Sequence, residues 1–355
     1  MQLNTLSPNR NIRRPVSRRS LRHAFSLIEL MVVIVIIAIL MALILSGVRG
    51  AMGTVRNATV TVEFKNLEKG ILDFKTKFGI EPPSSVTLYE DGTDWTTSAP
   101  PLAAAIAARS RSLVRQMWPD FSFSIDRDIN GDGDQADTIT LNGAECLVFF
   151  LGGVNGTNIV DKSGTVIGTP GNAVTAWTPL GFSASPVNPF ARGGARSGPF
   201  YEFDNARVVN RDAASASDPE GFPEYIDSLP GQRNPILYAS SYGGKGYRDV
   251  DVQLSPPATV YNEYATVPTR FSFVYRRYSE SDYPSSPTPA YPAPAAKFTA
   301  AEAFNPKTSQ LISPGADGEY GWGGVLSTNM ELLEPRPERY FERDNITNFK
   351  GGVLN

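Results

Sequence analysis

The first long apolar run of the chain begins within Arg22-His23-Ala24-Phe25-Ser26-Leu27-Ile28-Glu29-Leu30, and every side chain from Leu30 to Leu45 is apolar. Counted from Phe25, this segment reaches the roughly 20 residues with which an α-helix crosses a bilayer. A secretory signal has a shorter apolar core, with its cleavage site after that core. The sequence therefore predicts a membrane-spanning helix that carries one carboxylate, Glu29, near its start.

The leader that precedes Phe25 is strongly basic. It contains no acid and six arginines, which are Arg10, Arg13, Arg14, Arg18, Arg19 and Arg22. Positive charge of this kind is held on the cytoplasmic side of a membrane, so the rest of the chain is expected to be exported. An ionised Glu inside an apolar helix costs about 2.5 to 3.5 kcal/mol, and such residues usually mark a partner or a function. Glu29 lies about one helical turn after the new amino terminus that a cut after Ala24 would create.

The segment from Ala24 to Leu30 resembles the class III signal of type IV pilins and type II secretion pseudopilins. The resemblance implies that a prepilin peptidase cuts between Ala24 and Phe25 and methylates the new amine of Phe25. Ala24 departs from the usual Gly before the cut but keeps a small side chain there. The resemblance also implies that Glu29 pairs with the Phe25 amine of a neighbouring subunit during assembly. The alternative is a simple signal anchor whose Glu29 reaches the membrane interface.

The same resemblance implies the fold, the partners and the location. The fold is an α+β pilin fold, in which a long amino-terminal helix packs on an antiparallel sheet and a large loop-rich head is inserted. The expected partners are prepilin peptidase, other pilin or pseudopilin subunits and an inner-membrane assembly platform. The expected location is the inner membrane, with a single pass and an exported carboxy-terminal domain in the periplasm or at the cell surface. The implied divisions are a leader (1–24), a transmembrane and filament-core helix (25–46), the second half of that helix (47–80), an elaborated head (81–300) and a pseudopilin-like calcium loop region (301–355).

Composition argues against nucleic-acid binding and catalysis. The chain has 33 Lys and Arg against 36 Asp and Glu, and losing the leader would remove six arginines. An acidic surface is a poor match for nucleic acid. His23 is the only histidine and would leave with the leader, so the mature protein has no imidazole for acid–base chemistry or zinc. Cys146 is the only cysteine, so it cannot form an internal disulfide. We therefore expect a protein that is not an enzyme.

Several local patterns predict secondary structure. Val55 to Phe78 continue a helical rhythm, which Gly79 and the Pro82-Pro83 pair end. The apolar positions of this helix are Val60, Val62, Phe64, Leu67, Ile71, Leu72, Phe74 and Phe78, and Gly47, Gly50 and Gly53 predict a bend or a melted stretch before them. Further expectations are a helix over Ala103–Met117, strands over Thr138–Leu141, Cys146–Leu151 and Phe271–Tyr275, and an extended loop over Pro284–Pro294.

An acidic loop in the head has the spacing of a calcium site. Oxygen-bearing side chains recur at alternate positions, and Gly133 stands where an EF-hand-type loop turns sharply. Ile139 occupies the position of the usual bidentate Glu, so Asp137 would have to close the shell. The candidate ligands are Asp128, Asn130, Asp132, Asp134 and Asp137. The alternative is a solvated acidic turn.

A second acidic loop lies near the carboxy terminus, in Leu311-Ile312-Ser313-Pro314-Gly315-Ala316-Asp317-Gly318 with Asp344 later in the chain. This pattern resembles the carboxy-terminal calcium loop of major pseudopilins. The resemblance implies carboxylate ligands from Asp317 and Asp344 and backbone carbonyl ligands from Leu311 and Ser313. The alternative is a pair of polar turns that close hairpins.

These patterns favour a structural subunit of a type II secretion pseudopilus. The alternative within the family is a minor pilin of a type IV pilus whose head binds a surface or a partner. From a different class, the chain could be a membrane-anchored exported enzyme or carbohydrate-binding protein. In that case a sugar would stack on one of the four tryptophans, which are Trp95, Trp118, Trp177 and Trp322.

Overall fold

A computed structural model describes ten segments of the chain: 26–96, 101–130, 135–156, 178–209, 222–248, 251, 273–278, 302–321, 323–327 and 342–354. The leader, Phe25 and the predicted loop Pro284–Pro294 lie outside these residues. The chain divides into two units, Met1–Met52 and Gly53–Asn355. The arrangement is α+β, with one long amino-terminal helix followed by shorter helices and small, mainly antiparallel sheets.

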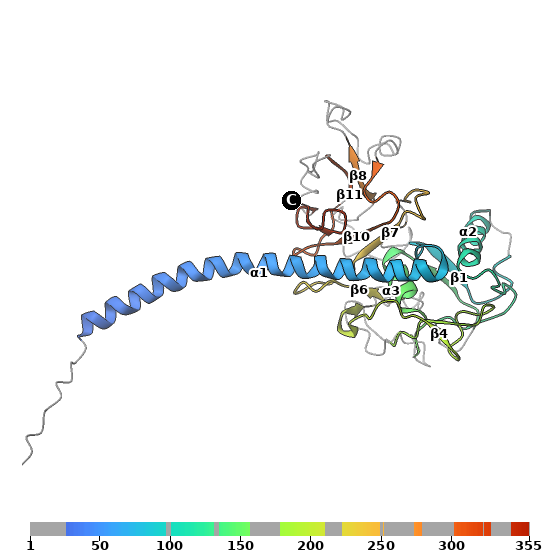
Figure 1. The fold of residues 1–355 in the computed structure, drawn as a ribbon, viewed down its shortest axis with the longest axis horizontal. Helices are drawn as coiled ribbons and strands as arrows, with labels where there is room; N and C mark the ends of the chain where they lie inside the picture. The colour runs from blue at the N-terminus through green and yellow to red at the C-terminus, as the bar shows by residue number, and fades with distance from the viewer. Residues whose placement is uncertain are drawn as a thin grey trace, which may run out of the picture. The chain divides into compact units, whose positions relative to one another are not determined.

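Helix α1 spans Leu27–Phe78 and is drawn in blue in Figure 1. The side chain of Ser26 accepts a hydrogen bond from the Glu29 amide at 3.2 Å and caps the first turn. Gly79, with φ of +80°, ends the helix and its amide donates to the Lys75 carbonyl at 2.8 Å. The helix is unbroken through the glycines between 47 and 53, so the predicted melted stretch is absent there. Each glycine costs only about 1 kcal/mol in a helix, which so long a helix tolerates.

The second half of α1 buries a single apolar stripe. Leu67 is fully buried, whereas Val62 and Leu72 are 56% and 59% exposed, because they point away from the stripe. Gly70 lies on the buried side, where a Cβ atom would sit 3.0 Å from the Phe200 carbonyl oxygen. The stripe repeats every three or four residues, as a helix packed on one face requires, and consists of Val60, Phe64, Leu67, Ile71, Phe74 and Phe78.

Helix α3, which spans Gly143–Gly152, packs in the same core as this stripe, and every one of its residues is buried. The sequence predicted a strand over Cys146–Leu151, and this prediction was wrong. Asn142 and Glu145 form a capping box: the Asn142 side chain accepts from the Glu145 amide, and the Glu145 side chain accepts from the Asn142 amide. A fully buried apolar run has no polar face to reveal its period, so the cap is the signal for a helix.

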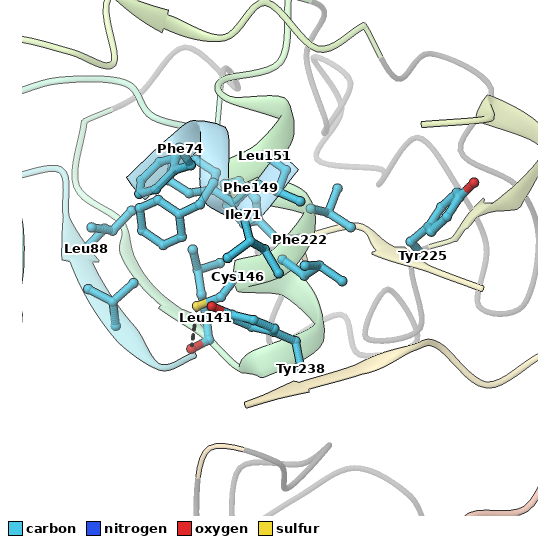
Figure 2. Close-up of a cluster of buried hydrophobic side chains, with 14 of the residues drawn as sticks. Ile71, Phe74, Leu88, Leu141, Cys146, Phe149, Leu151, Phe222, Tyr225 and Tyr238 are labelled. Carbon is cyan, nitrogen blue, oxygen red and sulfur yellow. Dashed lines mark hydrogen bonds between the residues drawn. The ribbon is translucent and has the colours of Figure 1, made fainter. Parts of the chain in front are cut away.

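Aromatic rings fill the space between α1 and α3. Figure 2 shows Phe74 of α1, Phe149 of α3 and the neighbouring Phe222 and Tyr238 around Cys146. The Phe74 and Phe150 rings meet edge to face with centroids 5.7 Å apart. The Cys146 thiol donates to the Leu141 carbonyl at 3.7 Å, and burial raises the pKa of this thiol well above its usual value. Cys146 is therefore a small core residue.

The main sheet is antiparallel and gathers strands from distant parts of the chain. Its order is β13-β12-β10-β7, with β7 at Leu237–Ser240, β10 at Ser309–Ser313, β12 at Ile346–Thr347 and β13 at Gly352–Val353. Beside this sheet, the Asn348 side chain donates to Glu68 of α1 at 2.7 Å. The carboxy-terminal strands are thus fastened to the helix and share a sheet with β7 of the head.

The remaining elements form short pairs. Strand β8 overlaps the predicted strand Phe271–Tyr275 but runs on to Tyr278. Strand β2 confirms Thr138–Leu141, and α2 confirms the helix predicted over Ala103–Met117. Strands β8 and β11 pair in parallel, in contrast to the antiparallel pairs elsewhere. The bounds are β1 Val86–Tyr89, α2 Pro101–Met117, β2 Thr138–Leu141, β3 Phe182–Ser183, β4 Arg196–Ser197, η1 Asn205–Arg207, β5 Val208–Val209, β6 Glu224–Tyr225, β8 Phe273–Tyr278, β9 Glu302–Ala303 and β11 Gly323–Ser327.

The buried stripe yields a prediction for which an exposed residue of the same helix provides the control. Leu67→Ala should lower the free energy of unfolding by about 2 to 5 kcal/mol, because it leaves a cavity in the core. Leu72→Ala, on the same helix but exposed, should change it by less than about 0.5 kcal/mol. Urea unfolding of the full chain in detergent, followed by tryptophan fluorescence, measures both values. Equal losses in the two variants would contradict the assigned face of α1.

Candidate functional site

The first part of α1 is the only helix in the described residues that is long and apolar enough to cross a membrane. This span is Leu27–Leu45, with a mean hydropathy of 3.3 and no residue buried within the protein. Glu29 is exposed in the first turn of α1, where the positive end of the helix dipole favours a carboxylate. Ala24 and Phe25, between which the sequence predicts cleavage, lie outside the described residues.

The carboxy-terminal loop brings two predicted carboxylates together. One oxygen of Asp344 accepts hydrogen bonds from the Ala316 amide at 2.6 Å and the Asp317 amide at 2.9 Å. Asp317 in turn accepts from the Glu319 amide at 2.8 Å. Partial burial raises the pKa of Asp317 to about 6, although the amide of Glu319 opposes the shift and the charges of Asp344 and Glu319 add to it. The loop thus concentrates negative charge.

Gly315 makes this close approach possible. Its φ is +71°, and a Cβ atom on it would lie 2.3 Å from the Asp344 carbonyl oxygen. The Gly315 carbonyl accepts from the Gln232 side chain at 3.1 Å, and the Gly318 carbonyl accepts from Asn234 at 2.6 Å. The loop is therefore held by Asp344, just before β12, on one side and by the segment before β7 on the other.

The other two predicted ligands of this loop lie in β10. The Leu311 carbonyl accepts from the Asn348 amide at 3.2 Å, so it already has a partner inside the sheet. The Ser313 hydroxyl donates to the buried carboxylate of Asp227 and accepts from the Gly315 amide at 3.1 Å. Burial raises the pKa of Asp227. Calcium coordination by the Leu311 and Ser313 carbonyls stays a prediction.

The acidic loop of the head is described only in part, because Asp132 and Asp134 lie outside the described residues. Asp128 forms an ion pair with Arg192 at 3.4 Å. The Asn130 side chain donates to the Asp137 carboxylate at 2.7 Å. The structure thus brings Asn130 and Asp137 into contact and gives Asp128 a cationic neighbour.

Glu90, which the sequence analysis missed, contacts the acidic loop of the head. Its carboxylate accepts from the amides of Ile129 and Asn130 at 2.5 and 3.2 Å. Burial raises the pKa of Glu90 to about 7, and the charges of Asp137 and Asp128 contribute to the shift. The pairing of β1 with β2 places Glu90 here, and that pairing of distant segments has no local signal in the sequence. Across the described residues, no three His, Cys, Asp or Glu side chains form a ready-made metal site.

Residues 19–45 match the family described as the prokaryotic N-terminal methylation motif. The chain carries the amino-terminal signal of type IV pilin-like proteins. The match covers the end of the leader, the predicted cleavage position and the span Leu27–Leu45, so this span is the kind of membrane anchor found in pilin-like proteins. No curated protein and no solved structure matches the chain. The pilin-like signal is therefore supported by residues 19–45, and none of these comparisons matches the head.

The carboxy-terminal loop yields a prediction that a second glycine, Gly351, controls. Gly315→Ala should destabilise the protein more than Gly351→Ala, which has a similar φ of +68° but nothing within 4 Å of its Cβ position. In the Gly351 variant the free energy of unfolding should fall only by the cost of placing Ala in a left-handed conformation, about 1 to 2 kcal/mol. Urea unfolding of both variants measures the difference, and equal losses would show that the approach of Gly315 to Asp344 is not constrained.

Proposed function

We propose that this chain is a structural subunit of a type II secretion pseudopilus, assembled through α1 after prepilin peptidase cuts before Phe25 and methylates it. The observation that carries the proposal is the methylation motif over residues 19–45, continuous with a helix that is apolar on every side through Leu45. An apolar surface of this size must be covered by lipid or by other helices. Other subunits of the filament and an inner-membrane assembly platform are the partners that would supply this cover.

The carboxy-terminal loop favours the pseudopilin over the minor pilin. Asp317 and Asp344 lie within one hydrogen-bonded loop, held by the approach of Gly315. We propose that these two carboxylates hold a calcium ion, because hard oxygen ligands from one curved loop suit this cation. The ion would offset the burial and the repulsion by Asp344 and Glu319 that together raise the pKa of Asp317, and it would fasten the loop to the residues just before β12. The exported domain would then lie in the periplasm or at the cell surface.

A role without catalysis is also part of the proposal. Trp95 and Trp118 are buried in the core and therefore cannot stack on a sugar at the surface. The Cys146 thiol is buried, and its raised pKa disfavours the reactive thiolate. These observations weigh against a carbohydrate-binding protein that uses either tryptophan and against a thiol enzyme.

Glu29→Gln tests the assembly role. The variant chain should still be inserted and cut, so mass spectrometry should find methylated Phe25 at its amino terminus. Filament incorporation should fall sharply, because the variant lacks the charge that neutralises the Phe25 amine in an apolar surrounding. Glu202→Gln, which changes an exposed head residue, is the control and should assemble normally. Normal filaments from Glu29→Gln, or a mature chain that begins elsewhere, would refute the proposal.

Asp317→Asn tests the proposed calcium ion of the carboxy-terminal loop. Equilibrium dialysis of the full chain in detergent should find one bound calcium ion fewer per chain than in the parent protein. Asp73→Asn, which alters an exposed carboxylate on α1, should leave the stoichiometry unchanged. An unchanged stoichiometry in Asp317→Asn would remove calcium from this loop without affecting the evidence from Glu29.

A further inference from the structure

The acidic loop of the head forms a cluster with Glu90 where the β1–β2 pair ends. Tyr89 faces Thr138 in the antiparallel register, so Glu90 and Asp137 are the next residues along the two strands. The Glu90 amide donates to the Asp137 carbonyl at 3.0 Å and extends the ladder by one bond. The Glu90 and Asp137 side chains are thus anchored by backbone hydrogen bonds rather than by a long surface loop.

Glu90 is the decisive residue of this cluster. It has no exposed surface, and one of its carboxylate oxygens accepts from the Ile129 and Asn130 amides. The other oxygen is buried and has no hydrogen-bond partner among the described residues. A buried carboxylate oxygen without a partner is costly, because it has lost water and gained nothing in exchange. Such an oxygen is expected to face a cation or a proton.

The charged groups around Glu90 are mostly acidic. The negative charges of Asp128 and Asp137 act on Glu90, and Arg192 is paired with Asp128 at 3.4 Å. Arg127 belongs to the same loop, but its guanidinium lies 4.2 Å above the Phe121 ring and donates to the Ser122 carbonyl. The carboxylates of Asp128 and Asp137 thus lie close enough to act on Glu90, and the guanidinium of Arg192 balances the charge of Asp128.

We propose that Glu90, Asp128, Asn130 and Asp137 bind a calcium ion at this end of the β1–β2 pair. The free oxygen of Glu90 would be one ligand, and Asp137 and Asp128 would supply two more carboxylates. Rotating the Asn130 amide by half a turn would replace its donating NH₂ by its oxygen at the place where it now meets Asp137. Calcium accepts such an irregular set of six to eight hard oxygens, whereas magnesium demands a near-ideal octahedron.

The site would fix three segments of the head to one another. Glu90 follows β1, the residues from Asp128 to Asp137 precede β2, and Arg192 donates to the carbonyls of Asp128 and Ile129 from a third segment. The single cysteine leaves this part of the chain without a disulfide, so a bound cation would supply a cross-link of another kind. The carboxy-terminal loop does not share any of these residues.

The first test uses the Asp317→Asn chain, in which the carboxy-terminal loop is disabled. This chain, in detergent, should still bind one calcium ion, and calcium should raise its melting temperature relative to the same sample in chelator. Adding Glu90→Gln should weaken calcium binding by about tenfold or more and abolish the rise. Absence of calcium binding in Asp317→Asn, or unchanged affinity after Glu90→Gln, would overturn the proposal.

A matched glutamate separates coordination from general stability. Glu81→Gln also changes a buried carboxylate with one unpartnered oxygen, but Glu81 pairs with Lys75 rather than with the acidic loop. It should lower the melting temperature while leaving the calcium-dependent rise intact. Asp137→Asn should abolish the rise, as Glu90→Gln does. A calcium-dependent rise lost in Glu81→Gln but kept in Asp137→Asn would contradict the site.

A spectroscopic readout covers the case in which a variant folds poorly. The Trp95 indole donates to the Tyr89 carbonyl at 2.9 Å, next to the Glu90 peptide. Terbium(III) in the calcium site of the Asp317→Asn chain should therefore luminesce on tryptophan excitation, and calcium should quench the signal by displacement. Trp95→Phe should remove most of the signal with no change in calcium affinity. Displacement by magnesium at the same concentration, or a full signal without Trp95, would overturn the assignment.

Discussion

Helix α1 is one continuous helix whose two halves present different surfaces, one exposed and apolar and one packed against the head. From Leu30 to Leu45 it is apolar on every side, and further on it buries only the stripe that contains Leu67 and Phe74. The head is assembled on that stripe: α3 and several aromatic rings pack against it in one core. Polar groups on the flanks of the stripe add specific ties, such as Glu63 to Arg207 at 2.5 Å and Glu68 to Asn348 at 2.7 Å.

These ties explain how the head keeps its place on α1 without a disulfide. Glu63 is buried, and its pKa is raised by that burial even though Arg207 opposes the shift. The Arg207 guanidinium also lies 4.6 Å from the centre of the Tyr225 ring, so it interacts with both the Glu63 carboxylate and an aromatic face. Without Arg207 the buried Glu63 carboxylate would lose its cation, which makes the arrangement specific even where its net stabilisation is small.

Patterns of local origin were predictable from the sequence. The period of the apolar residues identified the buried face of α1, although Val62 and Leu72 turned out to be exposed because they lie off the stripe. The strand expected at Cys146 was wrong, since a completely buried run carries no period and only the Asn142 cap distinguishes it. Asp317 and Asp344 lie in one hydrogen-bonded loop, and their role as calcium ligands stays a prediction. Glu90 was missed because strand pairing between distant segments brings it to Asp137.

The order of strands in the main sheet has a consequence for the order in which the chain can fold. Strand β10 lies between β7 and β12, and β13 pairs with β12 at the edge. A chain that becomes available for folding in sequence order thus cannot complete this sheet until the residues beyond Thr347 are also available. Until then the buried side of α1 has only part of its cover, and its apolar surface is open to chaperones and proteases. A chain truncated before β12 would therefore leave the apolar side of α1 incompletely covered.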